Sequence, residues 1–502
     1  MPDSTSPSPA EQPTKRRRVP RDPTARFKRD NESALAAAQA MVPEAHLSRQ
    51  VLKLMQRVDT SKVEAQYSAL GQRGYEPRGL LSVWVYASLI GLHHATKLAR
   101  ALVTDSALRL LTGGHVVSRA VLNRFRMQQA GLFGAALEQT VQWALEQGLV
   151  DAQALAVDSA RLRAHASLRH VRIRKQSEQR LQQLAQVDTS ALSAPERAQH
   201  EQKVAKHTQA VKLCTQAKAA SVVLTNKAAA LMQFPGDVYL PGHRLTVTAS
   251  GAQSRLVVGV LINAAPNDQG LLEHAVLQAR AVLHKAGLPS VASLQVAADA
   301  GYWSLPDLSF AQANTSWVDM LIHQKSNRSR LQAKGRPYFT RDAFRLVSRD
   351  EVRCPADKPM RGPTRYKASS PHSFTYRGDG CTSCPKHHAC TPSKSRQLVV
   401  HWDYEKLRSF MLQRMSQEGA LARYHQRMAT VEPVFSSVED SMGFRRVSSR
   451  REGTVHAEIL LKLLAHNVSR LLSRSKLLCV YFLLPLQAVP TPADTDQPLS
   501  LF

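Results

Sequence analysis

The apolar positions of this chain recur with two different periods. Between residues 33 and 150 they return every three or four positions, as at Leu47, Val51 and Leu54, and this spacing predicts amphipathic helices. From Leu155 onward, short apolar runs bounded by turn residues take over, which is typical of buried strands. The change of period predicts a helical first segment followed by a mixed α/β segment.

The second segment is expected to alternate strands and helices. The strands are predicted at 155–158, 245–250, 256–263, 293–298 and 317–323. The helices are predicted at 270–286, 404–428 and 455–473. A Gln/Ala/Lys-rich stretch at 168–220 is expected to form an inserted antiparallel hairpin of two helices.

A basic helix is expected at 119–126, with Ser118 as its N-cap. It follows the turn at Gly113-Gly114, so it has the arrangement of a recognition helix in a DNA-binding unit. In that case Arg124 and Arg126 contact DNA. The spacing fits equally well an ordinary helical hairpin whose arginines stay in solvent.

The net charge of the chain indicates which kind of molecule it binds. Lys and Arg number 67 against 39 Asp and Glu in 502 residues, a net charge of +28. This surplus favours a polyanionic partner, either nucleic acid or an anionic membrane surface. Six cysteines do not make a disulfide scaffold. The first twenty residues have no apolar run and the stretch 477–484 is too short to span a bilayer, so we expect a cytoplasmic protein without membrane contact.

Composition and pattern together predict six segments. They are a disordered basic tail (1–32), a helical DNA-binding domain (33–150), the first part of an α/β core (151–323, with the insertion 168–220), a basic cysteine-containing insertion (324–403), C-terminal helices of the core (404–475) and a tail (476–502).

Two acids stand where predicted strands end. Asp158 and Asp299 each follow an apolar run and precede small residues. A carboxylate beside a buried strand is costly unless it pairs or binds a cation, and convergent carboxylates bind Mg²⁺ or Mn²⁺. Taken singly, each Asp is more simply a turn former or a helix cap. The pair, on this order of strands in so basic a chain, favours metal-assisted phosphoryl transfer.

Several motifs resemble a known family. They are EAHLSRQV, YSALGQRGYEPRGLL, LARALVTDSALRLLTGG and NRFR near the N-terminus, ALAVDSARLRAHAS around Asp158, VAADAGYWS around Asp299, and YHQRMATVEPVFSSVEDSMGFRRVSSRREGTVHAEILLKLLAHNVSRLL toward the C-terminus. These segments resemble the DDE transposases of bacterial insertion sequences, over about residues 40 to 472.

The resemblance implies a fold and a set of site residues. It implies an RNase H-like catalytic core in which Asp158, Asp299 and Glu432 hold two Mg²⁺ (or Mn²⁺) ions. It also implies DNA contacts by Tyr424, Arg427, Arg445, Arg446 and Arg450, since arginine binds phosphate bidentately. Without the resemblance, each arginine alone is equally well a solvated residue of a helix face, and Glu432 an ordinary helix residue.

The implied activity is transposition. The enzyme would bind the terminal inverted repeats of its element, cleave double-stranded DNA with water, and join the freed 3′-OH to target DNA. A homo-oligomer on DNA is expected because two element ends must meet, and association with the nucleoid follows. The alternatives are a catalytically inactive DNA-binding relative and a nuclease that cleaves without strand joining.

The chain departs from the family pattern at two places near the acids. Ser159-Ala160 stands where the family usually has Gly-Thr. Glu439 stands seven residues after Glu432, where the family often has lysine. A negative charge there repels phosphate, so this contact is either absent or made by Arg445 instead.

Four cysteines fall within the basic insertion. Cys354, Cys381, Cys384 and Cys390 have the spacing C-x26-C-x2-C-x5-C, which can complete a tetrahedral structural Zn²⁺ site. His387 and His388 are alternative ligands, and four free thiols in a polar loop are the less favoured alternative to a metal site. The resemblance favours a structural metal, because related transposases carry a similar cysteine set.

Overall fold

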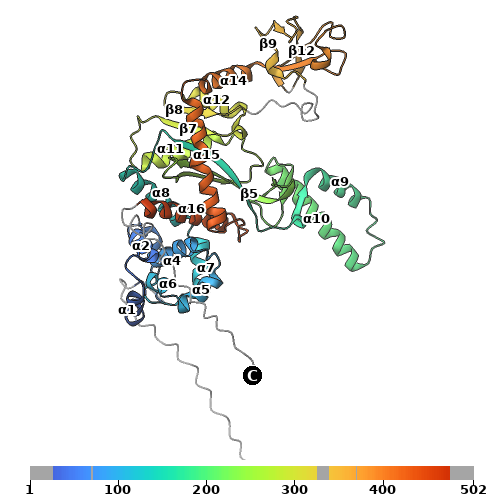
Figure 1. Ribbon diagram of the computed structural model, residues 1–502. Helices are drawn as coiled ribbons and strands as arrows, with labels where there is room; N and C mark the ends of the chain where they lie inside the picture. The colour runs from blue at the N-terminus through green and yellow to red at the C-terminus, as the bar shows by residue number, and fades with distance from the viewer. Residues whose placement is uncertain (1–25, 69–71, 325–337, 369, 475–502) are drawn as a thin grey trace, which may run out of the picture. The chain divides into compact units, whose positions relative to one another are not determined.

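The computed structural model describes residues 26–68, 72–324, 338–368 and 370–474 (Figure 1). Most of the predicted basic tail, the predicted C-terminal tail and the apolar stretch 477–484 lie outside these ranges. Within them, none of the helices combines the length and the apolar character needed to cross a membrane. The chain divides into two compact units, one made of Met1–Ala87 with His94–Phe125, the other of Ser88–His93 with everything from Arg126 onward.

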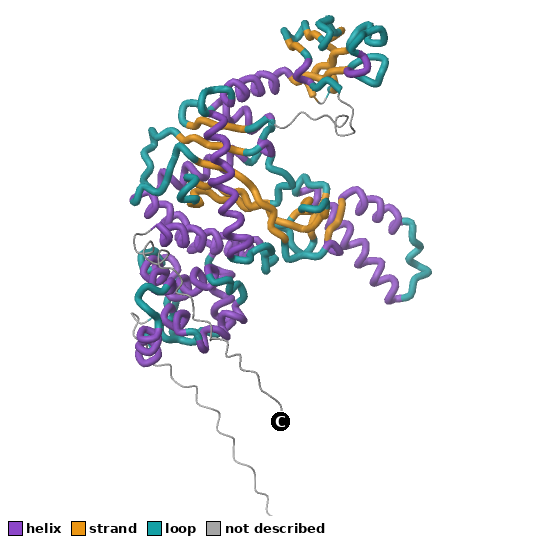
Figure 2. Tube along the Cα trace, viewed as in Figure 1, coloured by secondary structure: helices purple, strands orange, loops and turns teal. Residues whose placement is uncertain are grey.

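The first unit is helical, as its 3.6-residue period predicts (Figure 2). Its helices are α1 (Glu32–Met41), α2 (Leu47–Met55), α3 (Ser61–Glu64), α4 (Pro77–Leu89), α5 (Ala95–Thr104), α6 (Ser106–Leu111) and α7 (Arg119–Gln128). The last residues of α4 and α7 belong to the second unit. Asp105 separates α5 from α6 because its carboxylate accepts the Leu108 N–H and caps α6. Ser118 accepts the Val121 N–H in the same way at the start of α7.

The second unit is built on a six-stranded sheet in which β4, β5, β1, β7 and β8 lie in that order and β6 pairs with β5. The strands are β1 (Leu155–Arg163), β4 (Ala230–Phe234), β5 (Val238–Ser250), β6 (Leu256–Asn263), β7 (Leu294–Ala298) and β8 (Val318–Ile322). β5 is antiparallel to β1, β4 and β6, while β1, β7 and β8 are mutually parallel.

Helices cover both faces of this sheet (Figure 1). One face packs on α11 (Leu272–Lys285), α12 (Leu305–Ala313) and α14 (Trp402–Met415), and the other on α8 (Ala130–Glu146), α15 (Ala420–Ser436) and α16 (Glu452–Arg474). Alternate residues of β1 face the two layers. Val157 packs in the first core and Ala156 in the second.

Three predicted elements had the wrong bounds. The strand predicted at 245–250 begins at Val238, because β4 pairs with its first residues. The strand predicted at 155–158 continues to Arg163, because β5 pairs with it along its whole length, from Leu155↔Ser250 to Arg163↔Gly242. Asp158 therefore lies inside a strand rather than at its end. The helix predicted at 404–428 is two helices, since Gly419 adopts φ +71° and ends the connection between α14 and α15.

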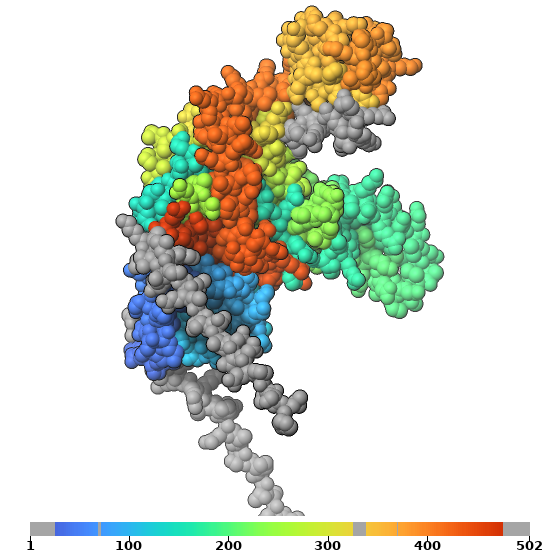
Figure 3. All heavy atoms as spheres, in the orientation of Figure 1, coloured from blue at the N-terminus to red at the C-terminus, as the bar shows by residue number. Residues whose placement is uncertain are grey.

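Two segments protrude from the sheet of the second unit (Figure 3). The stretch predicted as a helical hairpin forms α9 (Arg174–Ala185) and α10 (Ala194–Gln216), closed at its base by β2 (Val171–Ile173) and β3 (Ser221–Val223). The cysteine-containing segment forms β9 (Arg345–Leu346), β10 (Val352–Arg353), β11 (Arg361–Lys367), β12 (Ser370–Arg377), α13 (His387–Cys390) and β13 (Gln397–His401). The molecule is thus a mixed α/β protein with a helical N-terminal region, as predicted; the six predicted segment boundaries stay predictions.

A buried lysine in α16 gives the second unit a pH-dependent stability. Lys462 is 4% exposed, and its amine lies 2.9 Å from Ser88 Oγ and 2.8 Å from His93 Nδ1. Burial, helped by the charge of Arg126 and opposed by Glu458, lowers the pKa of Lys462 to about 7. The unfolded chain keeps the ordinary value near 10.5, so unfolding takes up a proton between these values and stability rises with pH across that window.

We therefore expect Lys462→Met to remove this rise. Between pH 7 and pH 8.5 the wild type should gain about 2 kcal/mol of unfolding free energy that the variant does not gain. Urea unfolding at the two pH values measures the difference. Lys285→Met, at an exposed lysine paired with Glu138, should follow the wild-type pH dependence. Parallel curves for Lys462→Met and wild type would contradict the assignment.

Candidate active site

The register of two parallel strands brings the first two predicted acids together. Val157 of β1 is paired with Ala298 of β7, so Asp158 and Asp299 follow directly on neighbouring strands. Asp158 points to the face of β1 that α15 covers. There its Oδ2 accepts a hydrogen bond of 2.8 Å from Nη1 of Arg427, which is 10% exposed.

Too little positive charge lies near the Asp158 carboxylate to keep its pKa at the ordinary value. Burial and the negative charge of Asp299 raise the pKa of Asp158 to about 6, although Arg427 and the Ser159 N–H act in the opposite direction. One arginine thus does not offset burial and a second carboxylate. A divalent cation would, and this is the observation by which the Asp158–Asp299 pair fits a metal.

Asp299 caps the short turn that follows β7. Its Oδ1 accepts the Gly301 N–H at 2.9 Å and so starts the 3-10 turn Ala300–Tyr302. A Cβ on Gly301 would lie 2.9 Å from Asp299 Oδ1 and 3.1 Å from Asp268 Oδ2. A side chain at position 301 would therefore have to displace one of two carboxylates.

Asp268 is an acid of this region that the sequence analysis did not identify. Its Oδ2 and Asp299 Oδ1 are at most about 6 Å apart, the sum of their distances from the Gly301 Cβ position. Its Oδ1 accepts a hydrogen bond from Arg244, whose side chain is 1% exposed and also donates to the carbonyls of Ala265 and Pro266. A lone Asp in a turn gives no sequence signal for such a position.

Glu432, the third predicted acid, lies on the same helix as Arg427 but is less closely tied to the pair. Its carboxylate is 4.0 Å from Arg427 Nη2 and its side chain is 51% exposed. It lines a hollow of about 570 Å³ together with Arg255, Ser436 and Arg470, among others. Within the ranges that the structure describes, no three His, Cys, Asp or Glu side chains are arranged to hold a metal ion.

Pro433, which follows Glu432, changes the hydrogen bonding of α15 beside the site. Pro433 stands inside α15 and has no N–H, so the carbonyl of Ala429 loses its helical donor. Arg255 of the β5–β6 turn supplies the replacement, since its Nε donates to Ala429 O at 3.2 Å. The turn is thereby attached to the helix beside Glu432.

Tyr424 and Arg427 lie side by side on α15. The ring of Tyr424 stacks on His323 with centroids 5.3 Å apart, and the Arg427 guanidinium is 6.0 Å from the same ring. Burial raises the pKa of Tyr424, so its hydroxyl is neutral near pH 7. The predicted pair is thus held next to Asp158.

The predicted basic stretch after α15 forms a loop with exposed arginines. Arg446, Arg450 and Arg445 are exposed, and Arg445 pairs with Asp440 at 2.6 Å. The loop is held on β1, where Val447 N–H donates to Arg163 O. It is also held on α16, where the buried Glu458 accepts hydrogen bonds from Ser448 and Ser449. Positive charge is therefore kept at the edge of β1.

The two arginines predicted in α7 differ. Arg124 is exposed. Arg126 is 11% exposed, lies 3.6 Å from Glu458 and donates to His93 O. These internal contacts occupy the guanidinium of Arg126. The DNA contact by Arg124 stays a prediction.

Two of the four predicted cysteine ligands, Cys354 and Cys390, lie in one small core, and Cys381 and Cys384 lie near Cys390. Among the described residues, the four thiols are not arranged as a metal site. Cys390 and the half-buried Cys354 pack with Phe344, Val352 and Tyr376, among other apolar residues. The pKa of the Cys390 thiol is raised by burial and by the nearby Cys381, Cys354 and Cys384. In the C-x2-C turn the Cys384 N–H donates to Cys381 O, and Lys386 joins this turn to Pro355 O beside Cys354.

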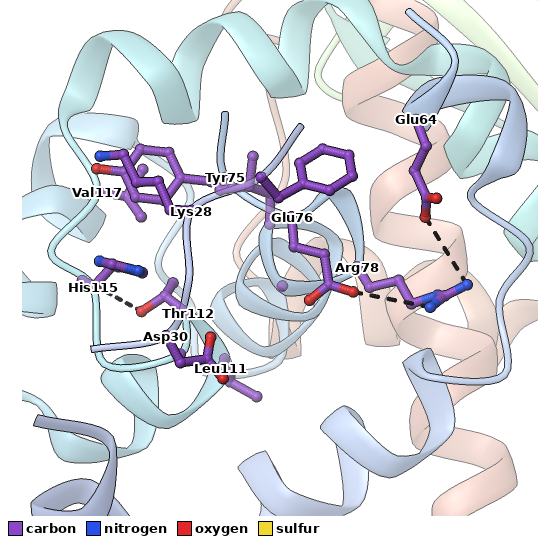
Figure 4. Close-up of a pocket in the computed structure, with 14 residues that line it drawn as sticks. Lys28, Asp30, Glu64, Tyr75, Glu76, Arg78, Leu111, Thr112, His115 and Val117 are labelled. Carbon is purple, nitrogen blue, oxygen red and sulfur yellow. Dashed lines mark hydrogen bonds and ion pairs between the residues drawn. The ribbon is translucent and has the colours of Figure 1, made fainter. Parts of the chain in front are cut away.

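The helical unit has a hollow of its own, of about 280 Å³ (Figure 4). Figure 4 shows Arg78 between the carboxylates of Glu76 and Glu64. Burial, with the negative charges of Glu64 and Asp30, raises the pKa of Glu76, while Arg78 opposes the rise. Because carboxylates repel phosphate, this hollow is not expected to contact a DNA backbone.

Two protein families match the chain. Residues 353–472 match the family described as Transposase DDE domain, and residues 36–128 match the family described as Transposase domain (DUF772). Both matches are to transposase families, and the first is to their DDE domain. The resemblance inferred from the motifs is confirmed at this level, and so is the transposase function. The first match includes Tyr424, Arg427 and Glu432.

Solved structures and curated proteins were also compared with the transposase. It is similar to a piggyBac transposase in a synaptic complex with hairpin DNA, at 9% identity and a TM-score of 0.30, with 89% of this chain and 77% of that chain covered. The comparison with curated proteins finds no match.

Proposed function

We propose that this transposase cleaves double-stranded DNA at the ends of its element and joins the freed 3′-OH to target DNA, using divalent cations held by Asp158, Asp299 and Glu432. The observation that carries the proposal is the pair of carboxylates on neighbouring parallel strands, with Arg427 as the only side chain among the described residues that forms an ion pair with Asp158. When bound, Mg²⁺ or Mn²⁺ would activate the attacking oxygen and stabilise the leaving oxygen of an in-line displacement.

The order of the acids along the fold supports an RNase H-like core. β1, β5, β6, β7 and β8 follow one another in the chain, apart from the small edge strands. Asp158 lies on the first of these and Asp299 directly after the fourth. Glu432 lies on a late helix. In the RNase H-like core that the resemblance implies, the three acids fall on the first strand, on the fourth strand and on a late helix.

The cationic side chains supply the DNA contacts of the proposal. Arg427 presents a planar guanidinium beside the acids, and such a group can bind a phosphate with two hydrogen bonds. The ring of Tyr424 limits its movement. The phosphate backbone of the DNA would then continue along β1, where it would contact Arg445, Arg446 and Arg450. We expect a homo-oligomer, because two element ends must be held together.

Cleavage of the DNA that flanks its own coding region tests the proposal. The purified chain should shift this DNA in a gel without metal, nick it with Mg²⁺ or Mn²⁺, and join the product to a target duplex. Binding without cleavage under either metal would favour the inactive DNA-binding relative. Cleavage without joining would favour the nuclease.

We further propose that Cys354, Cys381, Cys384 and Cys390 hold a structural Zn²⁺. The apolar core of this protruding segment is small, and small cores need a metal or a disulfide for stability. We expect one zinc per chain in the purified protein by elemental analysis, and its loss in Cys381→Ser. Cys214→Ser, at a buried cysteine of α10, should keep the zinc. Wild-type protein free of zinc would contradict this proposal.

A further inference from the structure

Behind the two aspartates, on the opposite face of β1, lies a hydrogen bond that the catalytic proposal does not use. Ser159 follows Asp158 on the strand, so its side chain points away from α15. Ser159 Oγ is 2.7 Å from the hydroxyl of Tyr302 and 2.7 Å from Thr246 Oγ1. The first contact links β1 to the turn that Asp299 caps.

Tyr302 is rigidly placed. It is 0% exposed and packs in the core with Val157, Ala298 and Leu308. It also ends the 3-10 turn that begins with Asp299. Because the ring is fixed in the core and the turn is short, a contact at the hydroxyl limits how far the Asp299 segment moves from β1.

The two contacts of Ser159 differ in what they join. Thr246 lies on β5 directly opposite Ser159, and the strands are already paired by backbone hydrogen bonds there. Tyr302 is the partner that reaches the Asp299 segment. The backbone pairing of β1 with β7 ends at Val157↔Ala298, one residue before both acids. Beyond Val157 and Ala298, the hydrogen bond between the hydroxyls of Ser159 and Tyr302 connects β1 to the Asp299 turn.

We propose that Tyr302 and Ser159 are positioning residues, whose hydroxyl pair fixes the spacing of Asp158 and Asp299 and thereby sets the affinity of these carboxylates for a divalent cation. The inference rests on the proposed function, since it assigns the two acids to metal binding. Neither hydroxyl touches DNA or the metal. Their effect is transmitted through the positions of the two carboxylates.

Mn²⁺ titration of the full-length chain without DNA tests the inference directly, followed by the Mn²⁺ and Mg²⁺ dependence of cleavage. Tyr302→Phe and Ser159→Ala should each raise the midpoint of both titrations about three- to tenfold, the range for loss of one hydrogen bond. The double variant should show no larger shift than either single one, because both remove the same contact. Ser159→Thr, which keeps the hydroxyl, should restore the wild-type midpoint.

Thr246→Val is the matched control. It removes the other partner of Ser159 but leaves the link to Tyr302, so its metal midpoint should equal that of the wild type. Affinity for DNA in the absence of metal should be unchanged in all these variants. A lower melting temperature with an unchanged metal midpoint would overturn the inference, and so would additive shifts in the double variant.

The two levels of proposal fail in different ways. If the wild-type chain binds no Mn²⁺ at these acids and never cleaves, the proposed function itself is wrong. If the wild type binds Mn²⁺ and Asp158→Asn abolishes this binding while Tyr302→Phe does not change it, only the positioning role is wrong.

Discussion

Asp158→Asn is expected to lower metal-dependent DNA cleavage about a thousandfold or more while DNA binding persists. The substitution keeps the size of the side chain and its hydrogen-bonding oxygen but removes the negative charge that a divalent cation needs. It also removes the partner charge of Arg427, which leaves that guanidinium available to phosphate. Gel-shift titration without metal and single-turnover cleavage with Mg²⁺ measure the two effects separately.

Asp319→Asn is the control for this variant. Asp319 lies on β8 of the same sheet and pairs with Arg414, at a comparable exposure of 26%. The Asp319→Asn variant therefore loses a similar ion pair outside the site, and its cleavage rate should stay within about twofold of the wild type. Equal losses in the two variants would indicate damage to the sheet rather than to a catalytic site.

Glu432→Gln is expected to lower cleavage about a hundredfold or more, again with DNA binding retained. Glu432 reaches the pair of aspartates through Arg427, at 4.0 Å, and stands on a helix fixed by the contact of Arg255 with Ala429 O. Glu418→Gln, at an exposed glutamate that precedes α15, should keep the wild-type rate. Single-turnover rates at saturating Mn²⁺ are the measurement.

Retained cleavage in Glu432→Gln would show that another acid completes the site. Asp268 is then the residue to test, because its Oδ2 lies within about 6 Å of Asp299 Oδ1. Asp268→Asn also leaves the buried Arg244 without its carboxylate, so its stability must be measured beside its activity. Asp307→Asn, at a buried acid that accepts hydrogen bonds from Gly270, Leu272 and Ser304 at the starts of α11 and α12, is the control for loss of a carboxylate elsewhere in the same core.

Much of the fold could be predicted because its signals are local. The helical period of residues 33–150 and the apolar runs of β6, β7 and β8 each appear in a short window. The length of β1 was underestimated because Ser159–Arg163 is not an apolar run. Its pairing with β5 makes it a strand. The break at Gly419 was missed because one glycine within a helical pattern does not by itself decide between a kink and an end.

For the candidate site too, local motifs could be predicted from the sequence, whereas contacts between distant residues could not. The motifs identified Asp158, Asp299 and Glu432, and Arg427 with them. They gave no sign that Arg427 pairs with Asp158, a contact between residues 269 positions apart. The burial of Arg126 against Glu458 was equally invisible, since an arginine on a helix has the same sequence signature in solvent and in a core.

By itself, the sequence determined the chemistry available to this transposase: the strong positive charge, the strand-borne acids, the cysteine cluster and the family motifs. Only the tertiary structure decided which groups meet. The register of β1 against β7 places two carboxylates together, and the folding of α15 over the sheet places a guanidinium on one of them. The reason is physical: period and turn chemistry act between neighbours in the chain, whereas register and helix packing are set by contacts between segments that the whole fold must first bring together.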